Sequence, residues 1–226
     1  MTTQTPAVLE AAPCCTRDAL VKGATLLAVL AGAAAYPLVV RPWHMRWGAT
    51  DDEIAQPMPM DDHVAEPTYV TNRAVTIHAR PEQVWPWLAQ IGEGRAAFYS
   101  YDWIERLIGM DVDSADRIHP EWQQLQVGDR LTRDDNILVR YVEPGRFLVV
   151  GPTDDNPEAA VTWAFGLYPD GEGGTRLVSR VRAQIKRWTP FTVLYLAALD
   201  PGQLLMERRM LLEIKRLAER DAPVTV

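Results

Sequence analysis

Two segments in the second half of the chain alternate in the manner of half-buried strands. From 161 to 168, large side chains at positions 161, 163, 165 and 167 are separated by small ones. From 175 to 186, Leu177, Val181 and Ile185 alternate with arginines. A period of two is typical of a strand with one face on a core. Because PDGEGG between them suits a hairpin loop, the pair predicts an antiparallel sheet with one dry and one wet face.

Three further strands are expected. Residues 136–142 and 146–151 flank Glu143-Pro144-Gly145, a sequence that suits a type II turn. Nearer the start, Val75 and Ile77 alternate with polar residues within 69–79. The chain therefore begins its folded part with one strand and returns to strands after residue 135.

Two short helices are expected between the first strand and the others. Pro81 fits the first position of one helix, and Pro86 inside it makes that helix short or kinked. Ser100 is expected to cap the second, with Asp102 near the positive end of its dipole. The connection from 109 to 129 that follows is long, and connections of this length are usually functional or mobile.

The clearest helix closes the chain. We expect Asp200 as its N-cap, Pro201 in its first turn and Gln203 completing a capping box. Its predicted buried stripe is Leu204, Leu211, Ile214 and Ala218. The fold class is therefore α+β: a curved antiparallel sheet whose dry face only this long helix is large enough to cover. Two short helices at the sheet edge would hold the helix off the sheet and leave a ligand cavity between them.

Several strings add a family resemblance. They are RPWHMRWGAT, AVTIHARPEQVWPWLAQIG, GRAAFYSYDWIERLIG, SADRIHPEWQQLQVGDRL and DPGQLLMERRMLLEIKRLAE. Together with the element order, they resemble the START-like helix-grip fold of the SRPBCC superfamily, which includes polyketide cyclase/dehydrase-like proteins, and a bacterial membrane-anchored branch of it. The resemblance runs from about 41 to 219. It implies an apolar cavity for a lipid or another hydrophobic small molecule, and it transfers no catalytic residue.

The cavity candidates are amphipathic aromatics and apolar residues of the expected inner surfaces, together with two ionisable groups. They are Trp85, Leu88, Arg95, Phe98, Tyr99, Tyr101, Trp103, His119, Trp163, Phe165, Leu204 and Leu211. Plain core packing is the rival interpretation for the aromatics. For Arg95 and His119 the rival is a structural role, because no set of nucleophile, base and orienting group is visible.

A metal site and a cofactor are not expected. Asp111, Asp113, Asp116 and His119 lack the central glycine and the ligand spacing of a calcium loop, so a solvated acidic loop is favoured. The G-x-G-x-x-A stretch from 92 to 97 follows a helix, where its backbone would not cradle a pyrophosphate. A net charge of −7 argues against nucleic acid as a partner.

The uncharged run from 24 to 40 predicts a single-pass membrane helix over residues 19–41. Trp43 and Trp47 with two arginines follow it, as in an interfacial belt. A cleaved signal peptide, with its site near Ala33–Ala35, and a buried core helix are the alternatives. The flanking positive charges are balanced two against two. The domain is placed on the cytoplasmic side because His44 adds to the downstream charge and because the domain lacks cysteines.

The expected organisation is a tail (1–18), the membrane helix (19–41), a linker (42–67), a ligand-binding domain (68–220) and a short tail (221–226). The expected function is membrane-anchored binding or transfer of a hydrophobic small molecule or lipid, without catalysis. Two alternatives stay open: a polyketide cyclase- or dehydratase-like enzyme that uses the same cavity, and a structural or regulatory partner with a closed one. Ionisable groups converging in the cavity would favour the enzyme, and a solid interior would favour the partner.

Overall fold

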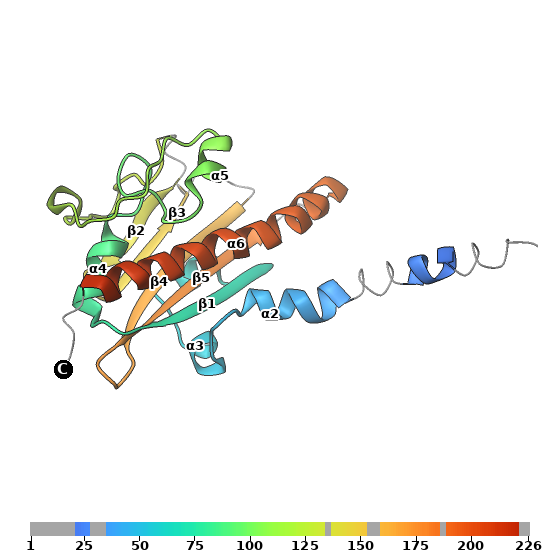
Figure 1. The fold of residues 1–226 in the computed structure, drawn as a ribbon, viewed down its shortest axis with the longest axis horizontal. Helices are drawn as coiled ribbons and strands as arrows, with labels where there is room; N and C mark the ends of the chain where they lie inside the picture. Colours follow the sequence, from blue (N-terminus) through green and yellow to red (C-terminus); the bar gives the residue numbers. More distant parts are fainter. Residues whose placement is uncertain (1–20, 28–34, 134–136, 153–158, 186–188, 222–226) are drawn as a thin grey trace, which may run out of the picture. The chain divides into compact units, whose positions relative to one another are not determined.

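The computed structural model describes residues 21–27, 35–133, 137–152, 159–185 and 189–221. The chain divides into two compact units, residues 1–43 and 44–226. The second unit contains the sheet and the long C-terminal helix (Figure 1). The predicted tails, 1–18 and 221–226, lie outside the described residues apart from Asp221, which ends the last helix.

Five strands form one antiparallel sheet in the order β1-β5-β4-β3-β2. Their bounds are β1 (Tyr69–Ile77), β2 (Leu138–Glu143), β3 (Phe147–Gly151), β4 (Ala159–Pro169) and β5 (Thr175–Ile185). The predicted strands and both hairpins are confirmed, with ends shifted by one or two residues. The first strand pairs with the last, with Arg73 opposite Ser179. Two strands that are far apart in sequence are therefore neighbours at one edge of the sheet.

The helices of the second unit confirm the predicted order but correct two predicted N-termini. Helix α4 (Pro81–Ala89) starts at its proline as expected, while α5 (Asp102–Leu107) has Tyr101 and not Ser100 at its N-cap. Helix α6 (Pro190–Asp221) has 32 residues and runs through Pro201. The prediction of Asp200 as an N-cap is therefore wrong, since the apolar stretch before it belongs to the same helix.

Helix α6 lies across one face of the sheet, called here the inner face (Figure 1). Along each strand, side chains on this face alternate with those on the outer face, as the period of two requires. Under the C-terminal half of α6 the inner face is solid: sheet residues such as Ile77, Leu148 and Leu177 form one core with Leu211 and Ile214 of the helix. This half of the interior therefore holds α6 to the sheet by apolar burial.

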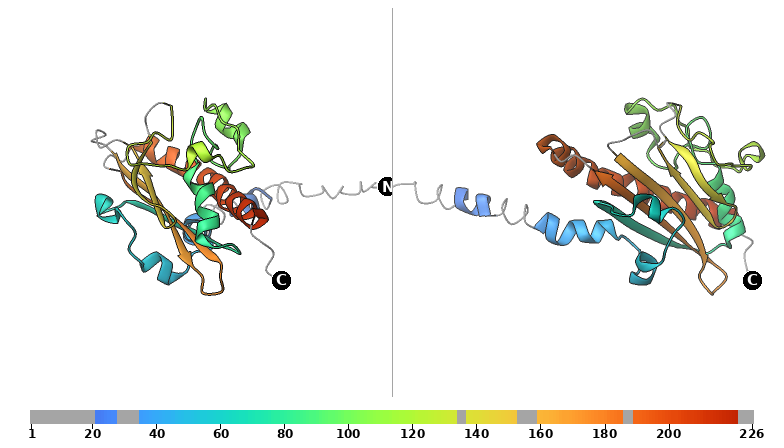
Figure 2. Two further views of the ribbon diagram at one scale, coloured as in Figure 1. Left: turned by 90° about the vertical axis from the view of Figure 1, so that its left-hand side faces the viewer. Right: turned by 180° about the vertical axis from the view of Figure 1, so that it is seen from behind.

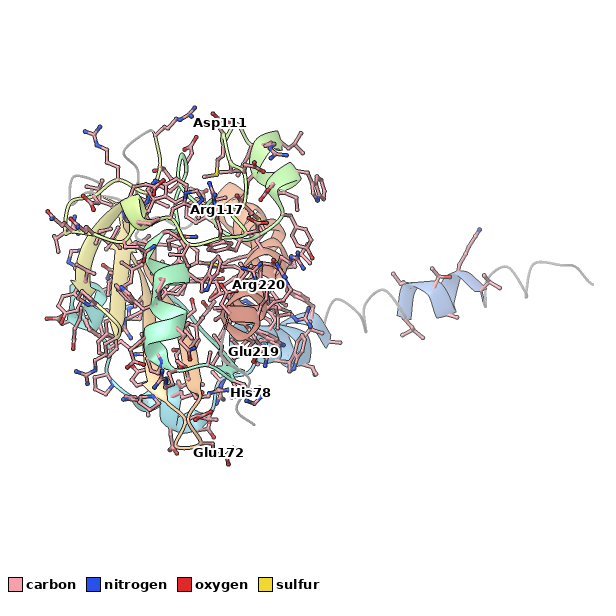
Figure 3. All side chains as sticks on the ribbon, turned by 60° about the vertical axis from the view of Figure 1, so that its left-hand side comes forward. His78, Asp111, Arg117, Glu172, Glu219 and Arg220 are labelled. Atoms are coloured by element: carbon pink, nitrogen blue, oxygen red, sulfur yellow. The ribbon has the colours of Figure 1, made fainter. Side chains whose placement is uncertain are left out.

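The C-terminal end of α6 is also tied to the neighbouring chain by hydrogen bonds. The backbone N–H of His78 donates to the Glu219 carboxylate at 2.8 Å, and the Arg220 guanidinium donates to the carbonyl of Asp116 at 2.7 Å. Figure 3 labels His78, Glu219 and Arg220 at this end of the molecule. These hydrogen bonds thus hold the C-terminal end of α6 in place beside the solid half of the interior.

The outer face is not the wet face that the arginine alternation predicted. A segment from 48 to 64 lies over it, containing α3 (Asp51–Ala55) and a 3₁₀ turn (Asp61–Val64) (Figure 2). A second core forms between Met58 of this segment and the outer face of the sheet. Residues 48–64, expected within a linker, are therefore packed on the sheet.

The arginines of β5 attach this segment to the outer face. Arg180 is 3% exposed and donates to Asp61 at 2.6 Å and to three backbone carbonyls of residues 53–56. Arg176 makes a two-point contact with the Glu53 carboxylate, at 2.7 and 2.8 Å. These side chains alternate like solvated ones, but they meet carboxylates and carbonyls from a distant part of the chain.

In the first unit, residues 21–27 are helical and Tyr36–Val40 form a π-helical segment that leads into α2 (Arg41–Met45). Large apolar side chains here are exposed: Leu27 by 69%, Leu38 by 75% and Val39 by 66%. Residues 28–34, the centre of the predicted membrane helix, lie outside the described residues. Within the described ranges, no helix combines the length and the apolar character needed to cross a membrane. The membrane helix stays a prediction.

Candidate functional site

A shallow hollow of about 370 Å³ opens to solvent beside α5 and α6. It contains three of the predicted cavity residues, Tyr99, Tyr101 and Trp103. The rest of its lining is polar or charged: Ser100, Asp102, Arg106, Ser114, Arg209 and Glu213. Trp103 is 65% exposed. The hollow is therefore a surface feature, and it does not lie between the sheet and α6 as the predicted cavity does.

The charged groups of this hollow mostly satisfy one another. Asp102 accepts hydrogen bonds from the backbone N–H and the hydroxyl of Ser114, at 3.0 and 2.6 Å. Arg209 lies 3.3 Å from Glu213, one helical turn away. Groups paired in this way on an open surface have little free capacity for a ligand.

Most other predicted cavity residues lie in the main core. Those that are buried there are Trp85, Leu88, Phe98, Tyr99, Phe165 and Leu211. Arg95 donates to the carbonyls of Ala89 (2.9 Å) and Trp122 (2.5 Å), which ties α4 to the loop that follows it. His119 stacks on Trp122 with ring centroids 4.1 Å apart. The structure therefore does not bring Arg95 and His119 into the hollow beside Tyr101.

The inner face changes character toward the N-terminal half of α6. On β1 the inward positions Val75 and Ile77 are apolar, whereas the next inward positions are Arg73, Thr71 and Tyr69. The Arg73 guanidinium is 0% exposed and forms an ion pair with Glu207 of α6, which is 3% exposed. Its Nε donates to the carbonyl of His44 at 3.2 Å. Burial raises the pKa of Glu207, and the neighbouring Arg73 and the side chain of Ser179 oppose that rise.

A second set of polar side chains, buried or half-buried, lies one to two helical turns further toward the N-terminus of α6. The Tyr69 hydroxyl donates to Asp200 at 2.8 Å and also contacts the side-chain oxygen of Gln203. His44 Nε2 lies 3.5 Å from the same Asp200 carboxylate. Burial and the adjacent Asp200 raise the pKa of Tyr69, so the phenol stays protonated. Together with Arg73 and Glu207, these residues form what we call the polar cluster.

Three atoms of this region have unused hydrogen-bonding capacity. Among the described residues, Arg73 Nη2, Glu207 Oε1 and Thr71 Oγ1 are buried and have no hydrogen-bond partner. A buried polar atom without a partner costs about 1–3 kcal/mol, so such atoms call for an explanation in a native fold. A bound polar group is one explanation, because it would supply the missing partners.

The inner-face side chains beside the polar cluster are less buried than those of the solid half. Phe165 and Leu211, in the solid half, are fully buried, whereas Trp163 and Leu204 are only half-buried. Trp163 stands two positions from Phe165 on the same strand face, and Leu204 stands two turns from Leu211 on the same helix stripe. The Trp163 indole N–H donates to the hydroxyl of Ser179 at 2.8 Å. We call this region, between Trp163 and Leu204 and next to the polar cluster, the open end.

The polar cluster was missed at the level of sequence, although its signal was present. Arg73 lies in phase with Val75 and Ile77, so the strand period alone places it on the inner face. Glu207 falls between Leu204 and Leu211 at the helical spacing of the predicted stripe. A charged residue in phase with a buried stripe requires a buried partner of opposite charge, and each of these two is the other's partner.

One further buried acid lies in α5. Glu105 is 2% exposed, and one of its carboxylate oxygens has no partner among the described residues. Burial, helped by the neighbouring Asp102, raises the pKa of Glu105 to about 7. The folded protein therefore binds this proton more tightly than the unfolded chain does between about pH 4.5 and 7.

Glu105→Gln is expected to remove this pH dependence. The raised pKa means that the wild type loses stability as pH rises from about 5 to 7, on the order of 2 kcal/mol, and no more above pH 8. Glutamine mimics the protonated acid and carries no charge at any pH. Urea unfolding at pH 5, 6, 7 and 8 would show the variant gaining on the wild type. If the free energies of unfolding of the two proteins change in parallel with pH, the raised pKa of Glu105 is contradicted.

Comparisons with known proteins name no function for the chain. No family model and no curated protein matches the chain. Protein MLL2253 from Mesorhizobium loti is 17% identical, with a TM-score of 0.40, over 69% of this chain and 100% of that one. DynU16, from the dynemicin biosynthetic locus, is 18% identical, with a TM-score of 0.38, over 66% and 48%. Ara h 8.0201 is 12% identical, with a TM-score of 0.35, over 68% and 99%.

Structural similarities with TM-scores this low do not support a fold or a function for the chain. The fold assignment rests on the chain's own features: a five-stranded antiparallel sheet, with the first strand paired to the last, and a 32-residue helix across one face. That arrangement fits the helix grip that the sequence resemblance implied.

Proposed function

We propose that this protein binds a small molecule with an apolar body and a polar end at the open end of its inner face. The observation that carries the proposal is a contrast in burial along one face: Phe165 and Leu211 are fully buried, whereas Trp163 and Leu204, on the same strand face and helix stripe, are only half-buried. Apolar surface left accessible in this way is favourable for an apolar ligand to cover.

The polar cluster supports the same proposal. Ligand sites are mostly apolar and carry a few polar groups that fix the ligand's orientation. Arg73 and Glu207 lie on the two surfaces that meet at the open end, and each keeps one free atom. In this proposal Trp163 and Leu204 hold the apolar body. Trp85, Leu88 and Phe98 serve the core that positions them.

Attachment to a membrane is part of the proposal. It is supported by the uncharged run from 24 to 40 and by the exposure of Leu27, Leu38 and Val39. An attached binding protein would stay close to the lipid phase in which apolar molecules concentrate. Recovery of the full chain in the soluble fraction of its host, before any carbonate wash, would remove this part and leave the ligand site untouched.

Leu204→Trp is expected to block the site, because the larger side chain fills the space beside Trp163. We would photolabel the full chain with a decan-1-ol analogue that carries a diazirine near the end of its alkyl chain, and map the label by peptide mass spectrometry. In the wild type, label is expected on the peptides that contain Trp163 and Leu204. In the variant that labelling should fall at least about tenfold, as a loss of 1.4 kcal/mol in affinity implies.

Leu205→Trp is the matched control. It adds the same side chain one position along α6, where Leu205 is 50% exposed, and should leave labelling within about twofold of wild type. Circular dichroism would be used to check that both variants fold. Equal labelling of the two variants, or wild-type label found only on residues 99–103, would contradict the proposed site.

A further inference from the structure

The ion pair of the polar cluster joins only one atom of each partner. Arg73 Nη1 contacts Glu207 Oε2, and the neighbouring atoms of the same two groups, Nη2 and Oε1, are left without a partner among the described residues. The guanidinium nitrogen is only a donor and the carboxylate oxygen is only an acceptor. The same ion pair therefore carries one free donor and one free acceptor.

A third free atom lies on the same strand face. Thr71 is 0% exposed, stands two positions before Arg73 on β1, and its hydroxyl oxygen has no partner among the residues described. A hydroxyl can donate one hydrogen bond and also accept hydrogen bonds. The unused capacity of the region is therefore mixed, with one donor, one acceptor and one group that can be both.

The charges of the ion pair balance each other. The Arg73 guanidinium is in contact with the Glu207 carboxylate, and Asp200 of the polar cluster is engaged by Tyr69 and His44. A carboxylate brought to Nη2 would also meet the Glu207 carboxylate, and an ammonium brought to Oε1 would also meet Arg73. Burying an ion without a counter-charge is strongly unfavourable, so neither charged end group fits.

We infer that the polar end of the ligand is an uncharged group that donates and accepts hydrogen bonds at once, such as a carboxamide or an alcohol. Its acceptor meets Arg73 Nη2 and its donor meets Glu207 Oε1, while the apolar body lies against Trp163 and Leu204. This inference rests on the proposed function, because it assigns the end group of the ligand at that same site.

Competition for the photolabel tests the end group directly. Four compounds built on a ten-carbon chain would be titrated against the diazirine probe on the full chain: decanamide, decyl methyl ether, decanoate and decylammonium. The ether accepts a hydrogen bond but donates none. Decanamide is expected to displace the label from the Trp163 and Leu204 peptides at a concentration at least about tenfold lower than any of the other three.

Two variants assign the preference to the ion pair. Glu207→Gln leaves the Arg73 charge without its partner and should improve competition by decanoate at least about tenfold relative to wild type. The double variant Arg73→Met with Glu207→Met removes both free atoms, and decanamide and decyl methyl ether should then compete equally. If Glu207→Gln does not fold, the double variant decides alone.

The outcomes separate the inference from the proposed function. If decanoate or decylammonium competes best in the wild type, or if the double variant keeps the amide preference, the inference is overturned while the site stands. If the wild type is not labelled at Trp163 or Leu204, the proposed function fails first.

Discussion

Replacing Arg73 by methionine is expected to lower the free energy of unfolding by about 3–5 kcal/mol. The substitution keeps much of the volume of the side chain but removes the counter-charge of Glu207, which is 3% exposed. A buried ion left alone costs far more than the intact pair gains, because its solvation is lost and not replaced. The carboxyl of Glu207 then has to take up a proton to fold, which adds a pH dependence. Urea unfolding at pH 7 measures the loss.

Two comparisons separate this effect from a general loss of an arginine. Arg216→Met removes an arginine from the surface of the same sheet–helix unit, where its side chain is 56% exposed and pairs with Glu213, and should cost no more than about 1 kcal/mol. The double variant Arg73→Met with Glu207→Met removes both charges and should recover most of the lost stability. A loss below 1 kcal/mol for Arg73→Met alone would show that the pair is not buried as described.

The second large effect is expected on the opposite face of the sheet. Arg180→Met should cost about 3 kcal/mol, because this buried guanidinium donates to Asn72 and Asp61 as well as to three backbone carbonyls of residues 53–56. Its removal leaves several acceptors without a donor at once. The segment from 48 to 64 should also separate from the outer face more often, since Arg180 connects residues 53–56 and Asp61 of that segment to β5.

Limited proteolysis of the native protein reports this second effect independently of global unfolding. Cleavage within 48–64 is expected to become at least about tenfold faster in Arg180→Met than in wild type. Arg146→Met is the control, because that side chain is 62% exposed, pairs with Glu143 three residues away and lies over the ring of Phe147, and both of these partners are outside residues 48–64. Unchanged cleavage within 48–64, with the stability loss present, would mean that Arg180 supports the sheet and not the segment.

Local patterns predicted the strands and the order of the elements. The alternation from 161 to 186 reflects side chains that face a core on one side, so it survives in the sequence without any knowledge of the partner surface. The turn at Glu143-Pro144-Gly145 is likewise encoded within a few residues, and Gly145 adopts a φ of 77° there. These features were predictable because their causes are local.

Features that depend on distant residues were predicted less well. The arginines of β5 alternate in the way solvated side chains do, and nothing within the strand says that Glu53 and Asp61 cover them. The N-terminus of α6 was misplaced because Asp200 and Pro201 carry a strong local start signal. Packing against the sheet continues the helix through that signal, which a reading of the local sequence cannot include.

The candidate site divides in the same way. Its apolar part was predicted, since Trp163 and Leu204 were named from the alternation and the helix stripe. Its polar part was not, because the roles of Arg73 and Glu207 depend on one another across 134 positions of the chain. The strand phase and the helix phase point both residues inward, and only their meeting makes that placement favourable.

The most direct test of the whole account is a crystal structure of the full chain grown with decanamide. It should show the alkyl chain between Trp163 and Leu204 and the amide beside Arg73 and Glu207. Side chains that fill that region completely, with the compound bound elsewhere or not at all, would contradict the claim that the long helix leaves one end of the inner face open.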